Sequence, residues 1–426
     1  MNVRADIIKP PKQDIFKSGK FRSIVTQSIV MVLVVGSILW IINNAATNME
    51  ANGISHGFSF LSETSFFDIG FLPFIEHTAS HTYFNAFLVG LLNTILVAVL
   101  GIFFATIIGF LVGIGRLSDN WLVARFCGFY VEALRNIPLL LQLFFWYHAV
   151  LRILPRAKNS LHLGDSFYLN LKGMFLPKPI PETGFNYVLL IGIFSIIVII
   201  FLYVWARKRQ AQTGQQFPIF STSLAIFIIP VLIVFFLNNS PITLEQPVLK
   251  GFNFKGGIRL TPELVALLLA LSLYTATFIA ENVRSGILAI NKGQIEAANA
   301  VGLKRMPILR LIVIPQAMRV IIPPLTSQYL NLTKNSSLAV AIAYPDLVHV
   351  FAGTALMQTG QAVEILAITM SVYLSLSITI SLLMNWYNKA MKLKDMAAIL
   401  KNVDDNTVMR IYFEMKPKKR QNILLA

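Results

Sequence analysis

The sequence predicts an all-α, polytopic membrane protein with about eight transmembrane helices. Hydrophobic residues make up 55% of the 426-residue chain and charged residues only 13%, whereas soluble proteins carry roughly 25% charged residues. The apolar residues are also gathered in long blocks that are nearly free of charge, which is the pattern of membrane-spanning helices. A soluble protein of this length would be expected to divide into two or three compact domains.

Each apolar block is about as long as the 20 residues needed to cross a bilayer, or somewhat longer. The predicted crossings lie at residues 24–42, 84–114, 122–151, 187–205, 220–237, 262–283, 320–343 and 363–387. The first block could alternatively be a cleaved signal peptide, since a basic segment precedes it and Ala45 and Ala46 follow it. Its roughly 19 residues exceed the apolar core of a typical signal peptide, so an uncleaved anchor is favoured.

The distribution of basic residues predicts that both termini are cytoplasmic. Residues 46–82 contain no Lys or Arg, whereas the N-terminal tail carries Arg4, Lys9, Lys12, Lys17, Lys20 and Arg22. Basic loops stay on the cytoplasmic side, so the N-terminus is placed there. Because each crossing changes the side of the membrane, the cytoplasmic side also receives Arg116, residues 207–209, residues 284–310 and the basic C-terminal tail. The long loop at 153–186 is the exception, because it would place four cations outside: Arg156, Lys158, Lys172 and Lys178.

Several other functions are disfavoured by composition. The net charge of +16 could indicate nucleic-acid binding, but the cations lie beside the apolar blocks, as in cytoplasmic loops of membrane proteins. The lone Cys127 excludes an internal disulfide. The six His residues lack metal-site spacing, so we expect neither a metal nor another cofactor in this chain.

The segment 308–350 contains too many residues for a single crossing, since a helix of that length would extend roughly 65 Å at 1.5 Å per residue. Interior prolines kink or break helices, and this region and its edge carry Pro307, Pro315, Pro323 and Pro324. The sequence therefore predicts an amphipathic piece on the cytoplasmic surface at 308–319. A crossing then begins near the pair Pro323-Pro324.

A short helix with a defined stop is predicted at residues 292–303. The segment is rich in alanine, the best helix former, and Glu296 is expected near the positive N-terminal end. Gly302 suits the left-handed position that follows the last helical turn. A two-turn helix is marginal alone in water, so it would act as a lever held by a partner. A plain helical loop is the alternative.

This segment resembles the EAA loop of binding-protein-dependent ABC importer permeases. Glu296, Ala297 and Ala298 are followed after three residues by Gly302, and nine residues later by Ile312-Val313-Ile314-Pro315. The family usually has Leu at the position of Ile314. The resemblance implies that an ATPase-coupling loop includes the following residues: Gly293, Gln294, Glu296, Ala297, Ala298, Gly302 and Pro315.

Further segments resemble one branch of that family, the polar amino-acid permeases of the histidine and glutamate type. They are residues 130–140, 278–286, 314–319 and 332–338. Two features resemble general L-amino-acid permease subunits. One is the Asn335-Ser336-Ser337 sequence within the last of these segments, and the other is the insert at about 153–261 with its two extra crossings. The resemblance covers roughly residues 84–152 and 262–390. It implies a type I ABC importer transmembrane domain at 84–390. A cytoplasmic tail, a first transmembrane anchor and a periplasmic loop would precede it at 1–83, and a basic cytoplasmic tail would follow at 391–426.

The resemblance also implies a multi-subunit importer for L-amino acids in the bacterial inner membrane. A periplasmic amino-acid-binding protein would deliver the substrate, and this chain with a second, similar permease would form a heterodimeric pathway. Two ATPase subunits would bind ATP, because this chain lacks a phosphate loop of the Gly-x-x-x-x-Gly-Lys-Ser/Thr type. The alternatives are a secondary transporter or channel, for which no inverted repeat is found, and an intramembrane enzyme, for which no catalytic constellation is found.

Charged residues within or at the ends of apolar blocks should face a partner or water, because unpaired charge in a bilayer is unfavourable. They are Glu132, Arg135, Glu281, Arg284 and Lys334. A free amino acid is a zwitterion, so Lys334 could receive its carboxylate and Glu281 its ammonium group. Alternatively, Glu281 and Lys334 neutralise each other or nearby arginines, which is favoured. Asn331, Asn335 and Ser336 could line the pathway or satisfy backbone groups near the proline pair.

Overall fold

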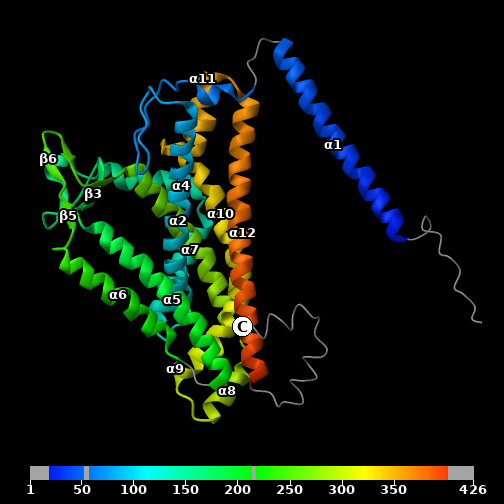
Figure 1. Ribbon diagram of the computed structural model, residues 1–426, viewed down its shortest axis with the longest axis vertical. Coiled ribbons are helices and arrows are strands. Elements are labelled where there is room, and N and C mark those ends of the chain that lie inside the picture. The colour runs from blue at the N-terminus through cyan, green and yellow to red at the C-terminus, as the bar shows by residue number, and fades with distance from the viewer. Residues whose placement is uncertain (1–18, 52–56, 214–216, 402–426) are drawn as a thin grey trace, which may run out of the picture. The chain divides into compact units, whose positions relative to one another are not determined.

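The computed structural model describes residues 19–51, 57–213 and 217–401 as a mostly helical chain (Figure 1). The chain divides into two compact units. One contains the described residues up to Gly90 together with Val350–Val372, and the other contains Leu91–His349 and the described residues from Tyr373 onward. Residues 1–18 of the predicted N-terminal tail and residues 402–426 of the predicted basic tail at 391–426 lie outside the described residues.

Apolar helices lie where the sequence predicted crossings. Among the described residues, five helices are long and apolar enough to span a bilayer, at Tyr83–Gly115, Phe185–Gln210, Pro262–Leu288, Arg305–Ile342 and Ala362–Lys389. Shorter apolar helices lie at Val25–Ile41, Leu139–Ile153 and Ser221–Leu237. Six of these segments lie within single α-helices. These helices are α1 (Gly19–Ala51), α2 (Tyr83–Gly115), α5 (Phe185–Thr213), α6 (Ile219–Leu237), α7 (Pro262–Leu288) and α12 (Ala362–Lys401). The number of crossings stays a prediction.

The predicted crossing at 122–151 does not form one continuous helix. The segment divides into α3 (Trp121–Asn136), α4 (Leu139–Phe144) and the π-helix η3 (Phe145–Val150). Ile137 adopts an extended conformation, because the ring of Pro138 disfavours helical geometry in the preceding residue. The buried Gln142 side chain donates to the carbonyls of Leu134 and Ile137 at 2.7 and 2.9 Å. This side chain satisfies backbone groups that the break leaves without helical partners.

The structure also shows no break between the predicted surface piece at 308–319 and the predicted crossing that begins near Pro323-Pro324. The helical span Arg305–Ile342 is continuous, and its parts are α9 (Arg305–Ile308), the π-helix η6 (Leu309–Val313), α10 (Ile314–Asn335) and the 3-10 helix η7 (Ser336–Ile342). Both prolines lie inside α10, which buries Ile321, Ile322 and Leu325 around them. Burial of this apolar face favours the helix enough to offset the lost hydrogen bonds. The helix ends instead at Ala343, which adopts a left-handed conformation.

The helix α7 is the packing centre of the larger unit and contacts α3, α4 and α10. Its start is defined by Thr261, whose hydroxyl accepts from Leu264 N at 3.4 Å. Two glycines of α2 allow its close approach: a Cβ at Gly109 would lie 2.6 Å from the Ile279 Cβ, and one at Gly113 would lie 2.7 Å from the Ala280 carbonyl oxygen. This Gly-x-x-x-Gly spacing is a common helix-contact pattern in membranes, and it is not among the motifs predicted from the sequence.

The insert contains α5 and α6, which pack against each other, and short strands that the all-α prediction did not include. One sheet has the order β1-β2-β3-β8, and two further pairs are β4-β5 and β6-β7, all antiparallel. The strands are β1 (Leu161–Leu163), β2 (Phe167–Asn170), β3 (Gly173–Leu176), β4 (Lys178–Pro181), β5 (Ile242–Glu245), β6 (Val248–Lys250), β7 (Asn253–Lys255) and β8 (Ile258–Leu260). Runs of three or four residues are too short to show strand periodicity.

The smaller unit has a separate core beside the first turns of α2. A 3-10 turn, η2 (Ser59–Ser62), is followed by a bridge between Thr64 and Thr82. Ile69, Ala86, Val89 and Val350 form a buried apolar cluster. This packing holds the segment before α2 against the residues that precede α12.

Candidate coupling site and substrate pathway

The predicted stop-ended helix is present as α8 (Lys292–Ala300) and is capped at both ends. At its start, the Asn291 side chain accepts from Gly293 N at 2.9 Å. At its end, Gly302 has φ +82°, Gly302 N donates to Asn299 O at 2.9 Å, and Leu303 N donates to Ala298 O at 3.1 Å. These two bonds define a Schellman motif. The predicted left-handed conformation of Gly302 is therefore confirmed.

The predicted position of Glu296 near the helix N-terminus is wrong. The helix begins at Lys292 and has no acidic residue in its first turn, so Glu296 lies in the second turn. The favourable field of the helix N-terminus is concentrated in the first turn. Helix-dipole stabilisation therefore does not explain this carboxylate, which is exposed.

The helix α8 presents most of its surface to solvent. Ala298 is buried and Ile295 is half-buried, whereas Glu296, Ala297 and Ala300 are exposed. The exposed side continues into Val301 and Met306, which are 82% and 72% exposed. Contiguous exposed apolar surface is a feature of interaction sites.

Side-chain contacts connect α8 and the loop after α2 to the long helices. Gln316 Nε2 donates to Gln294 Oε1 at 2.6 Å, which ties α8 to the first turn of α10. Pro315 precedes this contact and lies in the same turn. The surface pair Arg305–Asp119, at 3.2 Å, joins α9 to the loop after α2. The predicted coupling residues therefore gather at one end of α7 and α10.

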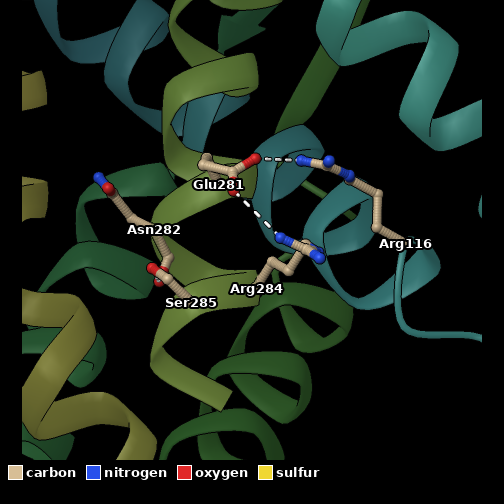
Figure 2. A network of polar contacts seen from close by, with 5 residues as sticks. All are labelled: Arg116, Glu281, Asn282, Arg284 and Ser285. Atoms are coloured by element: carbon tan, nitrogen blue, oxygen red, sulfur yellow. Dashed lines mark hydrogen bonds and ion pairs between the residues drawn. The ribbon is translucent and has the colours of Figure 1, made fainter. Parts of the chain in front are cut away.

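Glu281 is held by two arginines at this same end (Figure 2). It forms one ion pair with Arg116, which follows α2. It forms a second with Arg284, one turn further along α7, in which a guanidinium nitrogen lies 3.3 Å from the Glu281 Oε1 atom. The Glu281 and Arg116 side chains are 34% and 15% exposed. Because Arg116 is 165 residues away in sequence, the pair joins the end of α2 to α7. This contact agrees with the favoured expectation that nearby arginines neutralise Glu281.

The other charged residues predicted near the membrane are separate from this pair. Arg135, at the end of α3, lies over the Phe278 ring at 4.9 Å from its centroid. Glu132 is exposed on α3. In the described part of the chain, Lys334 has no carboxylate within ion-pair distance, so Glu281 and Lys334 do not pair with each other.

The predicted pathway residues on α10 differ in accessibility. Asn331 and Lys334 are exposed, and Asn335 is half-buried. Ser336 is fully buried, and its hydroxyl donates to Thr333 O at 2.8 Å, so it is engaged with its own helix. Ser327 is not among the predicted pathway residues, and it is exposed four residues before Asn331. Spacings of four and three residues place Ser327, Asn331 and Lys334 on one helix face.

Comparison with known proteins identifies the family. The general L-amino acid transport system permease protein AapQ of Rhizobium johnstonii is 52% identical over 374 residues, which cover 88% of this chain and 93% of the relative. The sequence profile of the family "Binding-protein-dependent transport system inner membrane component" matches residues 188–393. The chain belongs to this family. The predicted fold class, a polytopic helical membrane protein with the type I ABC importer fold, is thereby confirmed.

Two more inner membrane components are similar over nearly their full length. The putative amino-acid ABC transporter permease protein YhdX of Escherichia coli is 47% identical, covering 88% of this chain and 95% of the relative. The glutamate/glutamine/aspartate/asparagine transport system permease protein BztB of Rhodobacter capsulatus is 39% identical with the same coverage. The family match includes α7, α8 and α10, so the predicted coupling residues lie in its matched range.

In this inner membrane component, Glu281→Gln is expected to reduce uptake about tenfold, because losing a charge-assisted hydrogen bond of roughly 1.5 kcal/mol changes an equilibrium by that factor. Combining Glu281→Arg with Arg116→Glu restores an opposite-charge pair between α2 and α7 and should recover part of the uptake. Uptake measured with matched amounts of assembled complex checks this. A charge-swapped variant no more active than Glu281→Arg alone would argue against a structural pair and for substrate contact.

Proposed function

We propose that this chain is the permease subunit of an importer that carries L-amino acids into the cytoplasm, driven by a separate ATPase through α8. The observation that carries the proposal is the capped α8 with its exposed face, in a chain whose relatives are named as amino-acid permeases. Because two turns of helix are marginally stable alone, the caps indicate that the position of α8 matters.

The coupling mechanism follows from how α8 is attached. A groove of the ATPase subunit covers Ala297, Ala300, Val301 and Met306, and nucleotide-driven movement of that groove displaces α8. The Gln294–Gln316 contact passes the displacement to α10, which is part of one continuous helical span from Arg305 to Ile342. The helices then move between inward-open and outward-open arrangements, because a partner that binds one arrangement more tightly shifts the population.

The proposed assembly contains a second, similar permease, two ATPase subunits and a periplasmic binding protein. A heterodimer is supported by the two permease proteins BztB and BztC named for one transport system of Rhodobacter capsulatus, which are 39% and 28% identical to this chain. The chain lies in the bacterial inner membrane with both termini in the cytoplasm. It binds no cofactor itself, and the partner subunits bind ATP.

Co-purification and uptake test this function together. The tagged chain should bring down an ATPase subunit, and the reconstituted complex should take up labelled L-amino acids from a panel only when ATP is supplied inside the vesicles. A secondary transporter or channel would instead mediate uptake without ATP and without a copurifying ATPase. That result would overturn the proposal.

We also propose that the exposed α10 face (Ser327, Asn331 and Lys334) lines the pathway, with Lys334 receiving the substrate carboxylate. Lys334→Met is expected to reduce uptake about tenfold, because it removes a charge-assisted hydrogen bond. Lys334→Arg keeps the charge and should retain more uptake. Near-normal uptake by an assembled Lys334→Met complex would remove this residue from the pathway. Glu281 is proposed as a structural residue, since two arginines already balance its charge.

A further inference from the structure

The strands of the insert form a small folded body, here called the β module (residues 154–182 and 241–261). Its core contains Phe254, whose ring lies 4.4 Å from the Tyr168 ring and 5.0 Å from the Phe175 ring, measured between centroids. Ala157 completes the buried cluster. The module therefore has its own packing and presents a defined surface.

The β module lies at the end of α7 opposite to α8. Its last strand, β8, ends at Leu260, directly before the helix cap Thr261, whereas α8 follows the other end of α7. A helix of 27 residues is about 40 Å long at 1.5 Å per residue, which exceeds the apolar thickness of a bilayer. With α8 in the cytoplasm, the module faces the periplasm.

The surface of the β module is strongly basic. The module contains seven basic residues and only three acidic ones (Asp165, Glu182 and Glu245). All seven basic residues are exposed: Arg156, Lys158, Lys172, Lys178, Lys250, Lys255 and Arg259. None takes part in the ion pairs found among the described residues. Basic residues are normally depleted outside the cytoplasm, so this concentration of positive charge needs another explanation.

The module also has a cavity of about 460 Å³ between the β1-β2 and β6-β7 hairpins. Its lining is mixed in character and includes Lys158, His162, Asp165, Tyr168, Val248 and Phe254. Next to it, Lys158 Nζ lies 5.4 Å from the centroid of the Phe252 ring, and Phe252 is 81% exposed. An exposed aromatic ring beside a concave site is a feature of protein-docking surfaces.

We propose that the β module is the docking surface for a soluble protein with an acidic face, namely the binding protein of this importer, and that one of its side chains enters the cavity. The inference rests on the proposed function, because the family's dependence on a binding protein supplies the partner. Complementary charge steers association and selects the partner. A second copy of the module would bring like charges together, and a flat layer of lipid headgroups would not fill a concave cavity.

The test uses the full complex in nanodiscs and the purified binding protein that supports uptake by the wild-type complex. Combining Lys158→Glu, Lys250→Glu and Lys255→Glu should raise the Kd for the binding protein about tenfold, mainly through slower association. The wild-type Kd should rise with salt, and the Kd of the variant should rise less. The control Lys208→Glu, at the other end of α5, should leave binding unchanged.

A second variant, Val248→Trp, fills the cavity without changing charge and should also weaken binding. Basal ATPase activity and subunit composition identify variants that assemble correctly. Unchanged binding in both module variants of assembled complex would overturn the docking proposal, as would altered association with anionic lipid vesicles at an unchanged Kd for the binding protein. If no binding protein supports uptake by the wild-type complex, the proposed function itself fails, which is a different outcome.

Discussion

Gly302→Val is expected to reduce ATP-driven uptake about tenfold or more, because a β-branched residue in the left-handed conformation adds roughly 1–2 kcal/mol or more of strain. Gly302 has φ +82°, and a Cβ added there would meet no neighbouring atom within 4 Å, so the effect comes from the backbone and not from a clash. Loss of the Schellman stop would move Val301 and the rest of the exposed α8 face away from the proposed groove of the ATPase subunit. Uptake and ATPase co-purification measure this.

The matched control for this prediction is Gly302→Asn. Asparagine tolerates the left-handed conformation far better than valine, so this variant should retain most of the uptake although it adds a side chain at the same site. Both variants should be present in the membrane at similar amounts. Equal loss in both variants would mean that the surface at residue 302, and not its backbone conformation, is what the partner requires.

Gly113→Leu is expected to prevent stable assembly, because α2 and α7 touch through this residue. A Cβ there would lie 2.7 Å from the Ala280 carbonyl oxygen, and a backbone atom cannot move aside as a flexible side chain can. Overpacking of a tight contact destabilises by about 1–3 kcal/mol, and sometimes by more. Thermal stability of the purified complex in detergent and the amount of permease in the membrane should both fall.

Gly192→Leu is the matched control. Gly192 lies in the apolar helix α5, and nothing would contact a Cβ there within 4 Å. The same substitution at this site should leave stability and membrane abundance close to wild type. If both leucine variants were equally stable, the α2–α7 contact would not be as tight as the structure describes.

Two proline-containing segments illustrate how much local sequence can predict. At Ile137-Pro138 the helix breaks, whereas at Pro323-Pro324 it continues. Local preference disfavours helix before proline in both places. The outcome differs because Gln142 satisfies the freed carbonyls at the first site, while the buried residues Ile321 and Ile322 favour the helix at the second. Neither compensating effect can be recognised without knowing what packs nearby.

Features that depend only on residues adjacent in the sequence could be predicted without the structure. They are the apolar blocks, the alanine-rich α8 and its stop at Gly302. Hydrophobic length and backbone preference act over a few turns, so they can be recognised in a continuous segment. The pairing of Glu281 with Arg116, and the joining of strands from 161–181 and 242–260 into one module, became visible only in the folded molecule. These contacts join residues far apart in the chain, and they depend on how closely helices such as α2 and α7 approach each other.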